Sequence, residues 1–239
     1  MVDTPQSTHP QYAASLPDWE IMEDAYAGER VVKSRREKYL FMTESQIADG
    51  AKRGLEPGIS AYNSYLGRAR YPGFVAEAIR TALGMMHSKD PIITLPPGME
   101  KVRSVSGEDL KTLLQKINEQ QLLCGRLGLL VDVDQRTSLP YISLYRARHI
   151  TNWDFGERLD DGIHRPSMVV LDETGPQRIS MFEWETRERY RVLSLGVPGS
   201  TSAGSTYHSA VYEPKGGGAG FTTNLFTEIS LRGRTLSRV

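Results

Sequence analysis

The sequence lacks several features that would mark a disulfide-rich, membrane-spanning or strongly charged protein. Cys124 is the single cysteine among 239 residues, so no intrachain disulfide can form. The 29 Lys and Arg side chains balance 29 Asp and Glu side chains, and no global field would hold the chain on nucleic acid or an anionic membrane. No apolar run approaches the roughly 18 residues of a membrane span. We expect a protein of a reducing compartment with no membrane partner.

The sequence also lacks the short motifs of common catalytic sites. It has no G-x-x-x-x-G-K-[ST] loop, no G-x-S-x-G elbow, no H-E-x-x-H and no Cys/His spacing suited to zinc. The KGGGAG run at 215–220 has neither the Lys-Ser/Thr ending nor a following helix, and predicts a flexible tip. A Ser-His-Asp arrangement assembled by folding stays open. We predict no catalytic residue, no cofactor and no metal, and a protein that is not an enzyme.

One pattern keeps an enzymatic alternative open. In LLVDVD (129–134), Asp132 and Asp134 lie two residues apart, so both carboxylates would share one strand face and reach one divalent cation. Strand ends that meet water carry the same pattern, and no third ligand follows nearby, so we favour a solvated strand end. The alternative is a divalent-metal-dependent phosphoryl-transfer enzyme that uses Asp132 and Asp134.

Periodicity divides the chain into three parts. Residues 1–16 are polar and contain prolines, which predicts a flexible N-terminal arm, extended or disordered. Residues 17–124 form a helical part: the pattern predicts a short helix over 18–29, two helices separated by the break at 71–73, and a helix that ends at Gly125.

Residues 125–239 form the sheet part of the same domain, because the apolar period there changes to two. We predict strands at 127–134, 140–146, 149–155, 167–173, 178–186, 188–195, 207–213 and from 226. Their short connections favour antiparallel pairing. The fold class is therefore α+β, with N-terminal helices followed by an antiparallel β meander.

Large apolar side chains predict where the core lies. One broad face of the helix that follows residue 73 carries Phe74, Ala78, Ile79, Ala82, Met85 and Met86. We interpret this face as core; a Met-containing groove for a partner helix is the alternative. Trp153 and Trp184 fall within predicted strands, where they would pack in a core or an interface. Stacking on a base or sugar is the alternative for both.

The strongest cluster of charge is basic. It comprises Arg30, Lys33, Arg35, Arg36 and Lys38, within nine residues. We interpret it as a solvated surface segment, with a patch that binds phosphate or an acidic partner as the alternative.

Several phrases together resemble a known family. They are WEIMEDAYAGERVVKSRREKYL, YNSYLGRARYPGFV, LLCGRLGLLVDVD and PYISLYRARHITNWDF, in this order from Trp19 onward. The chain is similar to the tailed-bacteriophage portal proteins of the domain-of-unknown-function 4055 family. The order and joint occurrence of the phrases carry the resemblance, because none of them has catalytic content.

The resemblance implies a structural subunit of a portal ring, usually twelvefold, at one capsid vertex. Such a ring is a conduit for DNA packaging and ejection, in the virion and, during assembly, in the host cytoplasm. The implied partners are further copies of the chain, the major capsid protein, the terminase, the head-tail adaptor and double-stranded DNA without sequence specificity. The helix-then-strand order resembles the portal wing, and family members are longer, so we expect the chain to be truncated before the stem and clip.

A further alternative is a small binding or adaptor module. It would use the cluster from Arg30 to Lys38, or the edge of the strand after residue 225, because an unpaired strand edge can pair with a partner chain.

Overall fold

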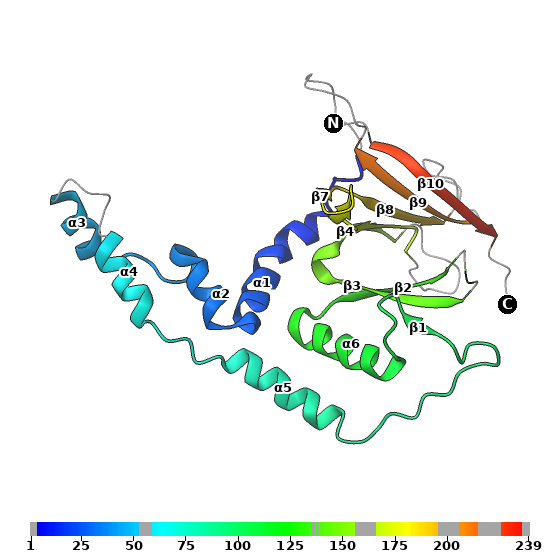
Figure 1. Ribbon diagram of the computed structural model, residues 1–239, viewed down its shortest axis with the longest axis horizontal. Helices are drawn as coiled ribbons and strands as arrows, with labels where there is room; N and C mark the ends of the chain where they lie inside the picture. Colours follow the sequence, from blue (N-terminus) through cyan, green and yellow to red (C-terminus); the bar gives the residue numbers. More distant parts are fainter. Residues whose placement is uncertain are drawn as a thin grey trace. The chain divides into compact units, whose positions relative to one another are not determined.

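The computed structural model describes residues 4–52, 59–134, 137, 139–155, 166–195, 206–214 and 226–235 (Figure 1). Its helices are α1 (Pro10–Ala27), α2 (Glu29–Ser34), the 3₁₀ helix η1 (Arg36–Lys38), α3 (Glu44–Lys52), α4 (Ile59–Arg68), α5 (Phe74–Met86), α6 (Leu110–Cys124) and the 3₁₀ helix η2 (Ala147–His149). Its strands are β1 (Arg103–Ser104), β2 (Leu127–Val133), β3 (Pro140–Arg146), β4 (Ile150–Asp154), β5 (Met168–Asp172), β6 (Gly175–Arg178), β7 (Trp184–Arg187), β8 (Tyr190–Leu195), β9 (Thr206–Pro214) and β10 (Phe226–Thr235).

Helices precede antiparallel sheets, which confirms the predicted α+β fold. The chain divides into two compact units, described separately below. The sheet unit comprises the described residues within Met1–Leu16, Arg126–Asp134 and Tyr141–Val239, and the helical unit those within Pro17–Gly125 and Gln135–Pro140. The predicted tip at 215–220 lies outside the described residues.

A five-stranded antiparallel sheet, in the order β10-β9-β8-β5-β4, forms the centre of the sheet unit (Figure 1). Val170 and Leu171 of β5 are both buried, and so are Ala210 and Val211 of β9. Successive side chains of a strand point to opposite faces, so both faces of the sheet are covered at its middle. The strand order follows the chain from β4 to β10, as in the predicted meander, except for one inserted hairpin.

That hairpin comprises β6 and β7, which pair only with each other among the described strands. The sequence predicts a single strand over 178–186, and this is wrong, because the chain turns back between Arg178 and Trp184. The apolar alternation of Ile179 and Met181 imitates a half-buried strand, but both side chains are exposed.

The N-terminal segment differs from its prediction. Helix α1 begins at Pro10, so an extended or disordered arm is wrong for residues 10–16, and the helix predicted over 18–29 starts eight residues earlier. Proline is tolerated at a helix start because the N–H it lacks has no partner there. The helix continues through Pro17 at the loss of one backbone hydrogen bond and ends before Gly28, whose φ is 91°.

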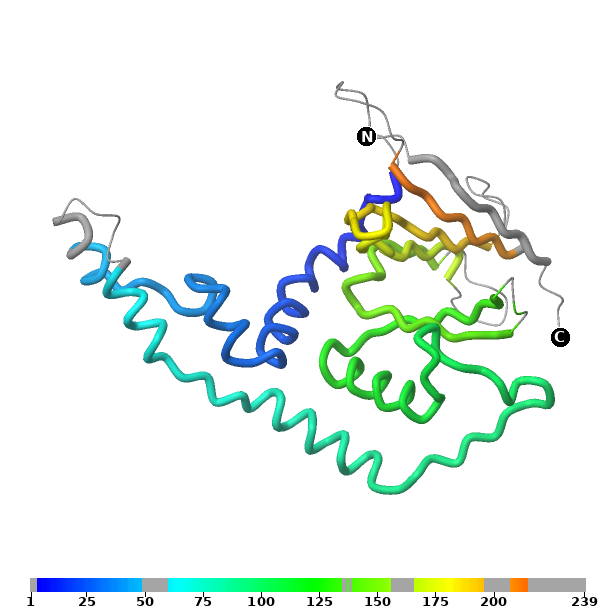
Figure 2. Tube along the Cα trace, in the orientation of Figure 1, coloured from blue at the N-terminus to red at the C-terminus, as the bar shows by residue number. Residues whose placement is uncertain are grey.

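Within the helical unit, α5 contacts α6, and the predicted break at 71–73 separates α4 from α5. Figure 2 shows an extended segment that leads from α5 toward β1. The buried face of α5 carries Ala76 and Ile79, whereas Phe74 is 76% exposed and Met85 68% exposed. Of the predicted core face, Ile79 is buried as expected, but a core position is wrong for Phe74, Met85 and Met86. The buried face is offset around the helix toward Ala76.

Gly128 of β2 lies against a buried side chain of the same unit. A Cβ at this position would lie 3.0 Å from Ile150 Cδ1 and 3.7 Å from Tyr145 Cβ. Glycine therefore lets the β2–β3 hairpin pack closely on β4, because a larger residue would push Ile150 aside.

We expect Gly128→Val to destabilise the protein by about 1–3 kcal/mol through overpacking against Ile150. Chemical denaturation followed by circular dichroism measures this change. Gly84→Ala is the control: Gly84 lies in α5 with no neighbour near an added Cβ, so alanine should stabilise the helix by about 0.5–1 kcal/mol. An unchanged midpoint in Gly128→Val would contradict the close packing.

Candidate functional site

The basic cluster predicted from the sequence lies on α2 and η1, in the helical unit, and acidic side chains of the same unit engage much of it. Lys33 Nζ lies 2.7 Å from Glu29 Oε1, one helical turn away. Arg36 donates to Asn63 Oδ1 at 2.7 Å and lies over the Tyr62 ring. The sequence could not show these partners, because Asn63 and Tyr62 come from α4.

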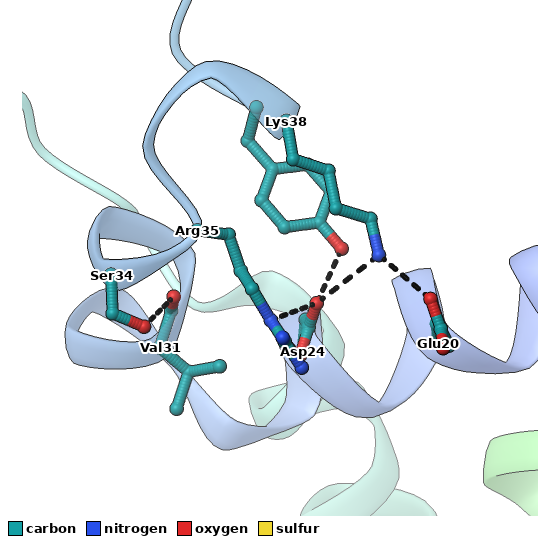
Figure 3. Close-up of polar contacts among 7 residues, drawn as sticks. Glu20, Asp24, Val31, Ser34, Arg35 and Lys38 are labelled. Carbon is teal, nitrogen blue, oxygen red and sulfur yellow. Dashed lines mark hydrogen bonds and ion pairs between the residues drawn. The ribbon is translucent and has the colours of Figure 1, made fainter.

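Asp24 of α1 binds two more cations of the cluster (Figure 3). Arg35 forms a bidentate contact, with Nε 3.1 Å from Oδ2 and Nη2 3.1 Å from Oδ1. Tyr39 donates to Oδ2 at 2.7 Å, and Lys38 Nζ lies 3.6 Å from Oδ2 and 3.1 Å from Glu20 Oε2. The Asp24 cluster therefore comprises Glu20, Asp24, Arg35, Lys38 and Tyr39, and it ties α1 to η1.

Asp24 is only 5% exposed, and its ionisation depends on these partners. Burial opposes the charge, but the hydrogen bonds from Tyr39 and Arg35 and the charges of Arg35 and Lys38 outweigh it and hold the pKa of Asp24 below its ordinary value. Arg30 is exposed and has no ion pair with a described carboxylate. It is the member of the predicted patch with most freedom to meet a partner; the patch itself stays a prediction.

Asp132 and Asp134 lie at the end of β2, as predicted. Asp132 Oδ1 accepts the Val133 N–H at 2.8 Å, and Tyr141 donates to Oδ2 at 3.3 Å. Among the described residues, no three His, Cys, Asp or Glu side chains come together as a metal site would require. The carboxylate is satisfied by local donors, so the geometry gives no support to the metal alternative.

A second polar network lies in the sheet unit and went unnoticed in the sequence. Glu173, after β5, accepts from Tyr145 at 2.6 Å and makes a bidentate contact with Arg191 at 2.6 and 3.2 Å. Burial and the neighbouring Glu173 raise the pKa of Tyr145. Burial opposes the charge of Arg191, but Glu173 outweighs it and raises that pKa too. Both pKa values move further from neutrality, so the network is suited to holding strands together rather than to proton transfer.

Trp153 of β4 is the centre of an aromatic stack in the sheet unit. The His9 ring stacks on it with centroids 4.1 Å apart, and the Arg126 guanidinium lies 3.7 Å from the indole centroid. Two groups so close to one ring centre must occupy its opposite faces. The backbone N–H of His9 also donates to the Thr151 carbonyl at 3.0 Å, which holds the N-terminal segment on β4. Trp153 therefore packs internally, while Trp184 is exposed, so a core position for Trp184 is wrong.

A cavity of about 520 Å³ adjoins this stack. Its lining is mainly apolar and comes mostly from β2, β3, β4, β5 and β8, and all of its residues belong to the sheet unit. Arg126 and Trp153 line it together, and Leu129 and Phe155 are about half exposed, so the cavity reaches the surface. A cavity of this size, mostly apolar and with one cation, is typical of a binding site rather than of a packing defect.

No protein-family model matches the chain, and no curated protein sequence matches it. Within the part of the chain that the structure describes, no helix is both long and apolar enough to cross a bilayer.

Removing the charge of Asp24 should loosen α1 from η1. We expect Asp24→Asn to lower the free energy of unfolding by about 1–3 kcal/mol, because it weakens hydrogen bonds to charged and phenolic donors. Asp90→Asn is the matched control: Asp90 pairs with Lys111 on the surface, where loss of the pair should cost less than about 1 kcal/mol. Urea unfolding of both variants gives the comparison, and equal costs would show that the Asp24 cluster adds nothing.

The contribution of Asp24 should also depend on pH. Its folded-state pKa lies below the ordinary 3.8, so its stabilisation is fully present above that pH and is lost as the pH falls through the folded-state value. The stability difference between wild type and Asp24→Asn should therefore stay constant from pH 7 to pH 5 and shrink below pH 3.8. Thermal unfolding across this range measures it; a difference that grows on acidification would contradict the lowered pKa.

Proposed function

We propose that the chain is a structural subunit of a phage portal ring at the capsid vertex, a conduit for DNA packaging and ejection. Two features support this proposal: the ordered sequence phrases that resemble the portal family, and the α+β fold with helices before an antiparallel sheet. In this role the chain is one of about twelve copies in a ring, in the virion and earlier in the host cytoplasm. The fold then corresponds to the wing.

The structural observation that carries the proposal is the exposed apolar surface. In the sheet unit, the tip of the β6–β7 hairpin exposes Ile179, Met181, Phe182 and Trp184 to water. Apolar side chains scattered singly need no explanation, but a contiguous group marks an interaction site. A subunit whose partners are other copies, the major capsid protein, the terminase and the head-tail adaptor requires such surfaces. The DNA in the channel, by contrast, requires no sequence-specific site.

One observation favours a second candidate, a binding or adaptor module. Strand β10 lies at the end of the five-stranded sheet and pairs, among the described strands, with β9 alone. An edge strand of this kind can add a partner's strand by backbone hydrogen bonding. This candidate shares the interaction role and differs in assembly: it would bind one partner chain and form no ring.

Native mass spectrometry of the protein purified from its source separates the two candidates. A portal subunit should give a closed oligomer of about twelve chains, because heterologous contacts that close on themselves form rings. The denatured chain mass, measured in parallel, is the control that fixes the copy number. A monomer or a one-to-one heterocomplex at micromolar concentration would contradict the ring and favour the adaptor.

A further inference from the structure

The apolar tip of the β6–β7 hairpin is held in a fixed shape. The Ile179 N–H donates to the Glu183 carbonyl at 3.0 Å, and the Glu183 N–H donates to Ser180 Oγ at 3.2 Å. Arg178 donates to the carbonyls of Ser180 and Met181. These bonds satisfy several polar backbone groups of the turn internally, while the large side chains of the tip are exposed.

Those side chains are large and mostly apolar. Met181 is 71% exposed, Phe182 83% and Trp184 65%. A buried aromatic side chain removes roughly 150–250 Å² from water, so a tip with two aromatics in three residues gains much by docking in an apolar hollow. Because the turn is already ordered, docking would cost little conformational entropy. The tip is therefore a preformed projecting element without a described partner.

The cavity beside Trp153 is a hollow of matching character on the same unit. Its volume of about 520 Å³ lies within the range of about 300–1,000 Å³ in which pockets enclose ligands the size of a few side chains. None of the hairpin's residues lines it, so the tip does not fill the cavity of its own chain. The charges are complementary as well, since Glu183 lies between Phe182 and Trp184 in the sequence and is exposed, and the cavity carries the Arg126 guanidinium.

We propose that the tip of the β6–β7 hairpin, with Phe182 at its centre, docks in the Trp153 cavity of a second copy of this chain. This inference rests on the proposed function, because both require that copies of the chain associate. It adds the two surfaces that meet. Phe182 enters the apolar part of the cavity, beside Leu129 and Phe155, and Glu183 faces Arg126. The tip and the cavity are different surfaces, so the contact is heterologous and each copy keeps one tip and one cavity for its neighbours.

Disulfide trapping between two different copies tests the contact directly. One chain carries Met181→Cys, which leaves Phe182 in place, and the other carries Leu129→Cys, both in a Cys124→Ser background, and the two are mixed and oxidised mildly. If the tip enters the cavity, the mixed pair should form at least tenfold more covalent dimer than either chain alone. The control replaces Met181→Cys with Ser88→Cys, an exposed position on the helical unit, which should give no enrichment.

The outcomes separate this contact from the portal proposal. A mixed disulfide in a protein that forms no large ring would support the contact and overturn the ring. A ring of about twelve chains without the mixed disulfide would overturn the contact and leave the portal role standing. Equal dimer yields from the mixed pair and the Ser88→Cys control would show random collision and would also overturn the contact, with the cavity then left to a different occupant.

A size measurement that needs no cysteine gives a second test. Phe182→Ser should weaken self-association at least tenfold in sedimentation velocity, whereas Ile92→Ser should leave it unchanged although Ile92 is 97% exposed. Circular dichroism melting of both variants checks that the fold is retained, which is expected because both side chains lie in water. Equal weakening by the two variants would attribute the effect to general surface hydrophobicity and contradict the proposed contact.

Discussion

The stack of His9, Trp153 and Arg126 is the interaction on which the sheet unit depends. It joins the N-terminal segment, the start of β2 and the middle of β4, three parts of the chain that are far apart in sequence. Ring contacts hold the half-buried indole in place, and the hydrogen bond from the His9 N–H to the Thr151 carbonyl fixes the N-terminal segment beside β4. Arg126 and Trp153 also form part of the cavity wall, so the shape of the cavity depends on the stack.

In the helical unit, charge holds α1 to η1. Asp24 gathers a guanidinium, an ammonium and a phenol around one buried carboxylate. The basic segment that follows is therefore less available to a partner than its sequence suggests. Several of its cations pair with acidic side chains of the same unit. The local field around α2 and η1 is consequently weaker than the density of Arg and Lys suggests.

Much of the fold could be predicted because periodicity reports local structure. The change of apolar period near Leu127 predicted the transition from helices to strands, and the Tyr71-Pro72-Gly73 break separated two helices correctly. Errors arose where tertiary contacts override a local rule. Pro5 and Pro10 indicated an arm over residues 1–16, yet His9 is anchored on β4, and α1 begins at Pro10 and continues through Pro17.

The candidate site was less predictable for the same reason. The alternation from Ile179 to Trp184 indicated one buried strand, and only the backbone trace shows a hairpin with its apolar side chains in water. The cavity and the Tyr145–Glu173–Arg191 network bring together residues from several strands, and no spacing in one strand can reveal them. Arg126 and Trp153 are adjacent in space and distant in sequence, so a single sequence gives no signal for the pair.

The sheet unit is discontinuous along the chain, and this has a consequence for its synthesis. The Asn152 amide donates to the Ser7 carbonyl across 145 positions of sequence, and the residues of the helical unit come between these two positions in the chain. On the ribosome, the N-terminal segment emerges first and must wait until β4 has been translated, while the intervening helices can fold through contacts of much shorter sequence separation. Folding of the sheet unit is then a late event, and the entropy of closing so long a loop falls on the final step.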